Sequence, residues 1–495
     1  MASDTRPDVA RLSPRGFRGA GLGRASYVEA PTEYRGTTVQ VCGLWPYPAG
    51  SGTPMVGTPI GHHLRTGATV CFDPITWFTR ANLISQPSMF VLGRPGLGKS
   101  TFTRRTVIGL AAQRVTPLVL GDLKPDYAHL VAALGGQVVK LGRGLGALNP
   151  LDVGALGRVL PRLSGAAAAR VRAEVRGRQL TMTAALITLA RRRPVTDHEE
   201  TILATALRLL DERHADTDPP LLSDLVTLLA DGHPDLHAVT LARGADERYR
   251  SAVDPLHRSL LGLLDGPLGS TFARHTTVPL DLHAPAVCID ISGIHAADER
   301  LQAAVLLACW SDGFGAIEAA HTLADAGLAP QRLFYAVLDE LWRVLRSGAG
   351  MVDRVDELTR LNRGHAVGTA YITHSLADLE ALQTESDRAK ARGFVERAAV
   401  VVCGGLPQRE LHELTQVVSF SQAEQRMITE WSTPPSWDAE LGRESAPPGQ
   451  GNFLIKIGQK PGIPVHVDLT PAELSTAVHN TNQRWQTHHD QPGPQ

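Results

Sequence analysis

The residues most able to do chemistry follow an apolar run near position 90 and read Gly93-Arg94-Pro95-Gly96-Leu97-Gly98-Lys99-Ser100-Thr101. The fixed positions match G-x-x-x-x-G-K-[ST], the pattern of a phosphate-binding loop. Glycines let backbone N–H groups converge on phosphate oxygens, and the helix that follows presents its positive N-terminal end to them. Lys99 would place its charge on the β- and γ-phosphates, and the Ser100 hydroxyl would ligate Mg²⁺. Because a strand-like run precedes the loop and a helix-like segment follows it, we predict that these residues bind ATP and Mg²⁺.

An acidic pair supplies the second part of such a site. The string LFYAVLDELW is a buried-strand pattern that ends in Asp339 and Glu340. Asp339 would hold the Mg²⁺ shell, directly or through water, and Glu340 would orient and deprotonate the attacking water. An ordinary strand end can carry the same two residue types, but the phosphate loop in the same chain favours the functional interpretation. We therefore predict a P-loop ATPase with Mg²⁺-dependent hydrolysis, with Asp126 as the next choice for the base.

Weaker patterns suggest the remaining roles. Thr373 or His374, at the polar end of GTAYITHS, could sense the γ-phosphate, although a polar strand end explains them equally well. Arg360 and Arg363 precede that strand and could reach the nucleotide of a neighbouring subunit. Asp290 also ends an apolar run, but no glutamate follows it, so we assign it a structural role.

These residues need a scaffold, and the apolar runs predict one. Short, mostly apolar segments alternate with helix-length segments, a pattern typical of a parallel sheet that is covered on both faces. The expected strands are Met89–Leu92, Leu118–Leu120, Val138–Leu141, Val287–Ile291, Leu333–Leu338, Val367–Ile372 and Ala398–Val402.

The pattern changes between the two halves of this sheet. Thr196 and Glu199 match a capping box that opens a helix, and the surrounding spacing is helical, so residues 155–265 are predicted to form an all-helical insertion. Near the C-terminus, NFLIKI and IPVHVDL flank GQKPG like a β-hairpin, and Thr470-Pro471 begins a last helix. We divide the chain into a loosely ordered N-terminus with a strand-rich lead-in (1–80), the first part of the core (81–154), the insertion (155–265), the second part of the core (266–478) and a disordered tail (479–495).

Composition restricts the classes of function. The chain has 495 residues, is 43% hydrophobic and 20% charged, and carries a net charge of -1. No global basic field therefore indicates nucleic acid or an anionic membrane, although DNA stays open as a partner through a local basic pore. The five cysteines are far apart and form no C-x-x-C pair, which favours a reducing, cytoplasmic setting without a disulfide framework. No signal peptide and no uninterrupted apolar window of about 18 residues is present, so we expect membrane association only through partners.

Several strings together resemble one family. Residues 118–152 are similar to the Asp-x-Lys-x-x-Tyr, Gly-Gly and Asn-Pro-Leu-Asp segments of the VirB/TraC-type conjugative-transfer motor ATPases, which power type IV secretion and belong to the HerA/FtsK-like division of RecA-type P-loop proteins. DGPLGSTF, LDELW, THSLADL and the C-terminal hairpin resemble later segments of the family in the same order. The resemblance implies a RecA-like core and the roles given above for Lys99, Ser100, Asp339 and Glu340. It also implies a sensor at the position of His374, where the usual residue is Gln.

The resemblance predicts an ATP-hydrolysing motor of a type IV secretion or conjugation apparatus. We expect a cytoplasmic homo-hexamer, peripheral to the inner face of the plasma membrane through channel subunits. Long members carry an N-terminal domain that contacts the channel. Too few residues precede the phosphate loop here to form it, so we expect either that this domain lies on a separate chain or that the docking role has been lost. Two alternatives remain: a DNA translocase of the FtsK/HerA type, which DNA would stimulate, and a nucleotide-gated scaffold with little turnover.

Overall fold

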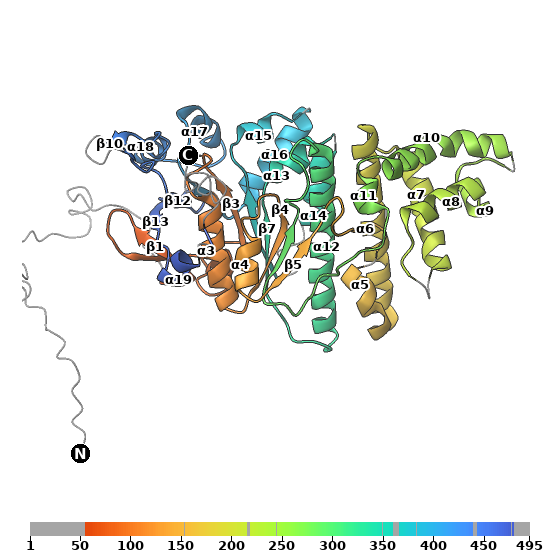
Figure 1. The fold of residues 1–495 in the computed structure, drawn as a ribbon, viewed down its shortest axis with the longest axis horizontal. Helices are drawn as coiled ribbons and strands as arrows, with labels where there is room; N and C mark the ends of the chain where they lie inside the picture. The colour runs from red at the N-terminus through yellow and green to blue at the C-terminus, as the bar shows by residue number, and fades with distance from the viewer. Residues whose placement is uncertain are drawn as a thin grey trace, which may run out of the picture. The chain divides into compact units, whose positions relative to one another are not determined.

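The computed structural model describes residues 55–152, 154–214, 218–243, 245–348, 350–359, 366–382, 384–438, 443–476 and 478–479. The chain divides into two units, Met1–Ala49 and Gly50–Gln495, and every described residue belongs to the second. Of the predicted N-terminal segment (1–80) residues 1–54, and of the predicted tail (479–495) residues 480–495, lie outside the described residues. Figure 1 shows the arrangement of the elements.

One sheet of eleven strands organises the second unit, in the order β2-β1-β13-β12-β9-β3-β8-β7-β4-β6-β5. Its strands are β1 (Pro59–His63), β2 (Thr69–Cys71), β3 (Ser88–Leu92), β4 (Thr116–Asp122), β5 (Gln137–Lys140), β6 (Val287–Asp290), β7 (Phe334–Leu338), β8 (Val367–Ile372), β9 (Val400–Cys403), β12 (Asn452–Lys456) and β13 (Ile463–Val467). A separate pair joins β10 (Trp437–Asp438) to β11 (Arg443–Glu444). All seven predicted strands are confirmed, as β3 to β9.

The seven strands from β9 to β5 are parallel, and the four at the other side are antiparallel. The predicted hairpin is confirmed as β12 and β13, but its role was not foreseen. It pairs with β9 on one side and β1 on the other, so it extends the central sheet.

The sheet is covered on both faces because its strands are apolar on both sides. Phe90 and Leu92 belong to one hydrophobic core, whereas Met89 and Val91 of the same strand belong to the other. This alternation follows from the two-residue repeat of a strand. The residues of α2 (Pro74–Thr79), α3 (Lys99–Ala112) and α4 (Ala128–Ala133) pack into the second core. The first core contains residues of α12 (Glu299–Asp325), α13 (Leu341–Arg346), α14 (Met351–Thr359) and α16 (Glu385–Arg397).

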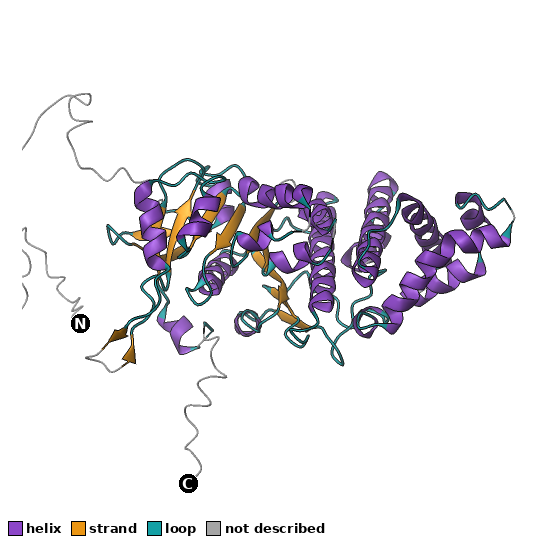
Figure 2. Ribbon diagram, turned by 90° about the horizontal axis from the view of Figure 1, so that it is seen from above, coloured by secondary structure: helices purple, strands orange, loops and turns teal. Residues whose placement is uncertain are grey.

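Within the described residues of the predicted insertion, all secondary-structure elements are helices, and in Figure 2 its outer helices lie together, apart from the strands. Its elements are α5 (Gly154–Val159), a short 3-10 helix (Leu160–Arg162), α6 (Gly165–Arg191), α7 (Asp197–Arg213), α8 (Leu222–Asp231), α9 (Pro234–Val239) and α10 (Asp246–Asp265), followed by α11 (Gly269–Phe272). The capping box is also confirmed: Thr196 accepts from the Glu199 N–H, and the Glu199 carboxylate accepts from the Thr196 N–H.

The remaining helices are short: α15 (Ala377–Glu380), α17 (Gln408–Leu414), α18 (Gln422–Trp431) and α19 (Pro471–Ser475), the last capped by Thr470 as predicted. Within the described residues, α12 alone is long and apolar enough to cross a membrane, and 78% of its apolar window is buried inside the protein. The burial identifies α12 as a core helix, packed against β4, α5 and α6. The described cysteines (Cys71, Cys288, Cys309 and Cys403) are buried and free, and Cys42 lies outside the described residues.

Candidate functional site

The site residues come from four strands whose carboxyl ends meet at one edge of the sheet. The phosphate loop follows β3, His374 follows β8, the acidic pair follows β7, and Asp126 follows β4. In the sheet these strands are consecutive neighbours, in the order β3-β8-β7-β4, and all run parallel. Parallel strands therefore bring together residues that lie far apart in the sequence.

The phosphate loop has the backbone that only glycine adopts readily. Gly93, Gly96 and Gly98 have φ of 155°, 84° and 98°. At Gly93 a side chain would also meet Gly404 at 3.1 Å from the added Cβ. Gly98 is the N-cap of α3 and offers no side-chain acceptor to the first turn, which contains no acidic residue. The N–H groups at the start of α3 are therefore left for an anionic ligand.

Lys99 lies folded over the loop. Its Nζ donates hydrogen bonds to the carbonyl oxygens of Gly93 (2.6 Å) and Arg94 (3.3 Å), and the residue is only 7% exposed. Burial lowers the pKa of Lys99 to about 8; the carboxylates of Asp339 and Glu340 oppose this effect. The ammonium group is thus held by carbonyl oxygens whose place phosphate oxygens can take.

Asp339 occupies the tip of β7. Its Oδ1 accepts a hydrogen bond from the N–H of Glu340 (2.8 Å), and its Oδ2 accepts one from the Tyr127 hydroxyl (3.3 Å). Burial, followed by the nearby charge of Glu340, raises the pKa of Asp339 to about 6. Asp339 is half-buried, and its surroundings disfavour the ionised carboxylate, so a cation bound at this position would stabilise it.

Glu340 is held in one arrangement by its neighbours. Its backbone is left-handed (φ 55°), which costs about 1–2 kcal/mol for a residue with a side chain. Oε2 accepts from Trp342 Nε1 at 2.5 Å, and Oε1 lies 3.1 Å from His374 Nε2 and 3.8 Å from Lys124 Nζ. Burial alone would raise the pKa of Glu340, but His374, Lys124 and Trp342 outweigh it and lower the pKa to about 2. In this arrangement Glu340 is a firmly ionised hydrogen-bond acceptor and a weak base.

The structure separates the two sensor candidates. Thr373 is 1% exposed, and its N–H donates to Val91 O at 3.1 Å, so it belongs to the sheet. His374 contacts Glu340 and keeps 30% of its side chain exposed. Of the two residues, His374 is the one placed to meet a ligand.

Residues after β4 complete the site, and sequence reasoning gave most of them no role. Asp122 Oδ2 accepts hydrogen bonds from the N–H groups of Tyr127 (2.8 Å) and Ala128 (3.0 Å), which fixes the turn that carries Asp126. Burial raises the pKa of Asp126, and Arg104, Lys124 and the Ser100 side chain nearby oppose that rise. The position of this segment at the tip of a strand, in a sheet with the acidic pair, is the signal that could have revealed these contacts.

Arg360 and Arg363, the two arginines predicted to reach a neighbouring subunit, are outside the described residues. Asp290 is buried at the end of β6, and its Oδ1 accepts a hydrogen bond from the N–H of Ser292 at 2.9 Å. Its carboxylate therefore stabilises the turn that follows β6.

The outer side of the phosphate loop is bonded to the C-terminal part of the chain. The N–H of Arg94 donates to Gly405 O at 3.0 Å, and its guanidinium donates to Ser432 O at 2.8 Å. The N–H of Gly451 donates to Leu97 O at 3.0 Å. The loop is therefore flanked by segments that come before and after the β10–β11 pair.

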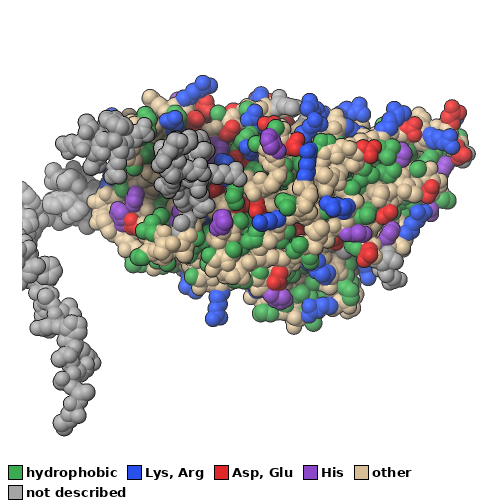
Figure 3. Space-filling view, viewed as in Figure 1, with side chains coloured by type: hydrophobic (Ala, Val, Ile, Leu, Met, Phe, Trp, Pro, Cys, Tyr) green, Lys and Arg blue, Asp and Glu red, His purple; other side chains and the backbone are tan. Residues whose placement is uncertain are grey.

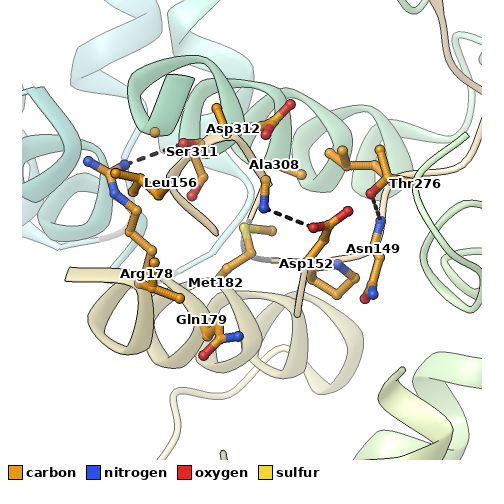
Figure 4. A pocket seen from close by; sticks show the side chains of 16 residues that line it. Asn149, Asp152, Leu156, Arg178, Gln179, Met182, Thr276, Ala308, Ser311 and Asp312 are labelled. Atoms are coloured by element: carbon orange, nitrogen blue, oxygen red, sulfur yellow. Dashed lines mark hydrogen bonds between the residues drawn. The ribbon is translucent and has the colours of Figure 1, made fainter. Parts of the chain in front are cut away.

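A small polar cavity of about 50 Å³ lies away from the loop, where the helical insertion joins the core (Figure 4). Asn149 and Asp152 line it from one side, and Arg178 donates to Ser311 O at 3.3 Å across it. Burial, followed by the charge of Asp152, raises the pKa of Asp312 in this cavity to about 6. The space suits one or two water molecules and is far too small for a nucleotide.

No protein-family model matches the chain, and no curated protein matches its sequence. Among solved structures, this chain is similar to VirB4 of Thermoanaerobacter pseudethanolicus. The similarity covers 86% of this chain and 100% of the VirB4 chain, with 17% sequence identity and a TM-score of 0.64. A bacterial conjugative coupling protein, TrwBdeltaN70, is similar over 82% of this chain and 87% of its own, with 12% identity and a TM-score of 0.47. The likeness to VirB4 confirms the predicted fold class, and the chain has the RecA-like P-loop ATPase fold of that structure, with a helical insertion and a C-terminal hairpin.

Proposed function

We propose that this chain is an ATP-hydrolysing motor of a type IV secretion or conjugative-transfer apparatus. The observation that carries the proposal is the meeting of the phosphate loop, Asp339, Glu340 and His374 at one edge of the sheet. The fold shared with VirB4 supports the choice of apparatus. On the face drawn in Figure 3, Lys and Arg side chains are interspersed with Asp and Glu.

The phosphate end of ATP would bind to the N–H groups at the start of α3, with Lys99 on the β- and γ-phosphates. The oxygens of Ser100, Asp339 and Asp126 fit the hard ligand set that Mg²⁺ prefers. When bound, Mg²⁺ neutralises charge on the phosphates.

Hydrolysis then requires a water next to Glu340. The water oxygen attacks the γ-phosphorus, the bond to the bridging oxygen breaks, its electron pair leaves with ADP, and the water proton passes to Glu340. Glu340 must first exchange one of its present partners for that water, because His374 and Trp342 occupy both carboxylate oxygens. ATP binding would drive this exchange by offering His374 a phosphate oxygen.

The assembly that follows from the proposal is a homo-hexamer on the cytoplasmic side of the membrane, attached through channel subunits. Each γ-phosphate would face a neighbouring subunit. Hydrolysis would then move the helical insertion or the C-terminal elements against that neighbour.

A turnover assay on the purified chain tests the proposal. We expect phosphate release from ATP that stops when EDTA removes Mg²⁺ and is lost in Lys99→Ala, with the fold intact by circular dichroism. Wild-type rates in Lys99→Ala would refute the loop assignment. Strong stimulation by DNA would favour the translocase, and ATP binding without turnover would favour the scaffold.

A further inference from the structure

A lysine outside the phosphate loop faces the same site. Lys124 follows β4 within the segment Asp122–Tyr127. Its Nζ lies 3.8 Å from Oε1 of Glu340, while 66% of its side chain is exposed. Among the described residues, Glu340 is the carboxylate with which it forms an ion pair, and its charge also acts on Asp126, where it opposes the rise in pKa. An exposed lysine that points inward, at the carboxylate assigned to water activation, needs an explanation.

Packing does not explain this position. Surface ion pairs of lysine contribute little to stability, and a long exposed side chain loses entropy when it is held in one place. The fold here depends on the Asp122 carboxylate, which bonds the turn, and on the buried ring of Tyr127. Lys124 therefore contributes its charge to the site while the fold rests on its neighbours.

The geometry shows which charge Lys124 could meet. Any water that Glu340 activates lies within hydrogen-bond reach of its carboxylate, and the γ-phosphate lies just beyond that water. A flexible ammonium group 3.8 Å from Glu340 reaches the same space. Lys99 approaches this space from β3 and Lys124 from β4, on the two sides of β8 and β7. Two cations thus converge on a region where the ligand carries its highest negative charge.

Resting on the proposed function, we infer that Lys124 binds the γ-phosphate of ATP from within the same subunit and holds Glu340 beside the attacking water. The site is then sensitive to the third phosphate in particular. ADP lacks the group that Lys124 contacts, so Lys124 distinguishes ATP from ADP. The same charge stabilises the negative charge that develops on the γ-phosphate in the transition state.

The test compares ATP with ADP in a background without turnover. In Glu340→Gln, the affinities for both nucleotides are measured by isothermal titration calorimetry, with and without Lys124→Ala. A hydrogen bond to a charged group corresponds to about 10- to 100-fold in affinity, so we expect Lys124→Ala to weaken ATP by that factor and to leave ADP unchanged. Lys124→Arg, which keeps the charge, should restore most of the ATP affinity.

Lys140 provides the matched control. It is an exposed lysine at the carboxyl end of β5, on the same sheet edge but two strands from β4. Lys140→Ala should change neither affinity. In the otherwise wild-type chain, Lys124→Ala should lower kcat about 10²-fold, as removal of one transition-state donor does elsewhere.

The outcomes separate this inference from the proposed function. Equal losses for ATP and ADP, or no loss for either, overturn the role of Lys124 while nucleotide binding stands. If the parent chain binds neither nucleotide, the proposed function fails and the role of Lys124 fails with it.

Discussion

His374 Nε2 lies 3.1 Å from Glu340 Oε1, so the residue at the sensor position is bonded directly to the proposed base. A neutral imidazole that donates from Nε2 holds the carboxylate in place, and a phosphate oxygen could compete for the same donor. Sensing of the nucleotide and release of the base would then be one event. Under the proposed function, histidine could take the place that glutamine usually holds in the resembled family, because either side chain can donate one hydrogen bond.

The first prediction concerns that donor. His374→Gln keeps a hydrogen-bond donor and should retain turnover within about threefold, whereas His374→Ala removes it and should lower kcat by about tenfold. Steady-state kinetics with ATP and Mg²⁺ measures both. Equal activity of the two variants would show that the contact with Glu340 has no part in the reaction.

The second prediction concerns the base. Glu340→Gln keeps the shape and the hydrogen bond from Trp342 but cannot accept a proton, so ATP should bind and remain uncleaved. Removal of a general base commonly lowers rates by about 10²–10⁴-fold. Chromatography of the bound nucleotide after incubation gives the measurement. A loss below tenfold would transfer the role to Asp126, the neighbouring carboxyl group whose pKa the charge of Glu340 helps to raise.

The third prediction concerns the neighbouring subunit. If Arg363 acts on the nucleotide of a neighbour, specific activity should rise with protein concentration as the ring forms. Lys99→Ala subunits keep Arg363, so mixing them with Arg363→Ala subunits should restore part of the activity at mixed interfaces. An arginine supplied in this way contributes about 10³–10⁵ in rate in other P-loop enzymes. Constant activity per subunit, across a dilution range in which the protein is seen to dissociate, would contradict a shared site.

The fourth prediction concerns stability and pH. Arg191 donates to both oxygens of Glu199 (2.6 and 2.7 Å), which joins the end of α6 to the start of α7. The hydrogen bond from Arg191 is the largest cause that lowers the pKa of Glu199, from its ordinary 4.5 to about 2. Because the folded pKa is depressed, the stabilisation is complete above about pH 5 and is lost as pH falls from there towards 2.

Glu199→Gln should therefore lower the free energy of unfolding by about 1–3 kcal/mol at pH 7 and by much less at pH 3. Urea unfolding at the two pH values measures the difference. Glu212→Gln is the control, because its ion pair with Arg208 is exposed and should contribute less than about 1 kcal/mol. A pH-independent effect of Glu199→Gln would assign its role to packing.

Much of the core could be predicted from the sequence. Strands such as β3 and β7 are continuous apolar runs in the sequence. The spacing of the glycines and the lysine in the phosphate loop is also recognisable, because few other local structures need these residue types in this order. Contacts between distant segments could not be predicted in the same way. The pairing of β1 with β13 joins residues 59–63 to residues 463–467, and no local pattern in either segment specifies that partner.

The same limit applied inside the site. Asp339 and Glu340 could be predicted as site residues because they follow an apolar strand pattern. The approach of Lys124 to Glu340 could not be predicted, because it depends on β4 lying next to β7. Strand order is a property of the whole fold, and a local string does not contain it. The left-handed backbone of Glu340 could not be predicted from the sequence either, because glutamate has no preference for that conformation.

Hydrogen bonds join the phosphate loop to Ser432 and Gly451, so the last part of the chain supports one side of the proposed nucleotide site. A protein truncated before α18 would lose the acceptor for the Arg94 guanidinium and the donor for Leu97 O. It would also remove β12, which pairs with one edge of β9, and would leave that edge of β9 unpaired. An open, apolar edge strand is a template for association with other chains. We therefore expect a protein truncated before α18 to aggregate and to have a less ordered phosphate loop. Such a truncation would not give a smaller active protein.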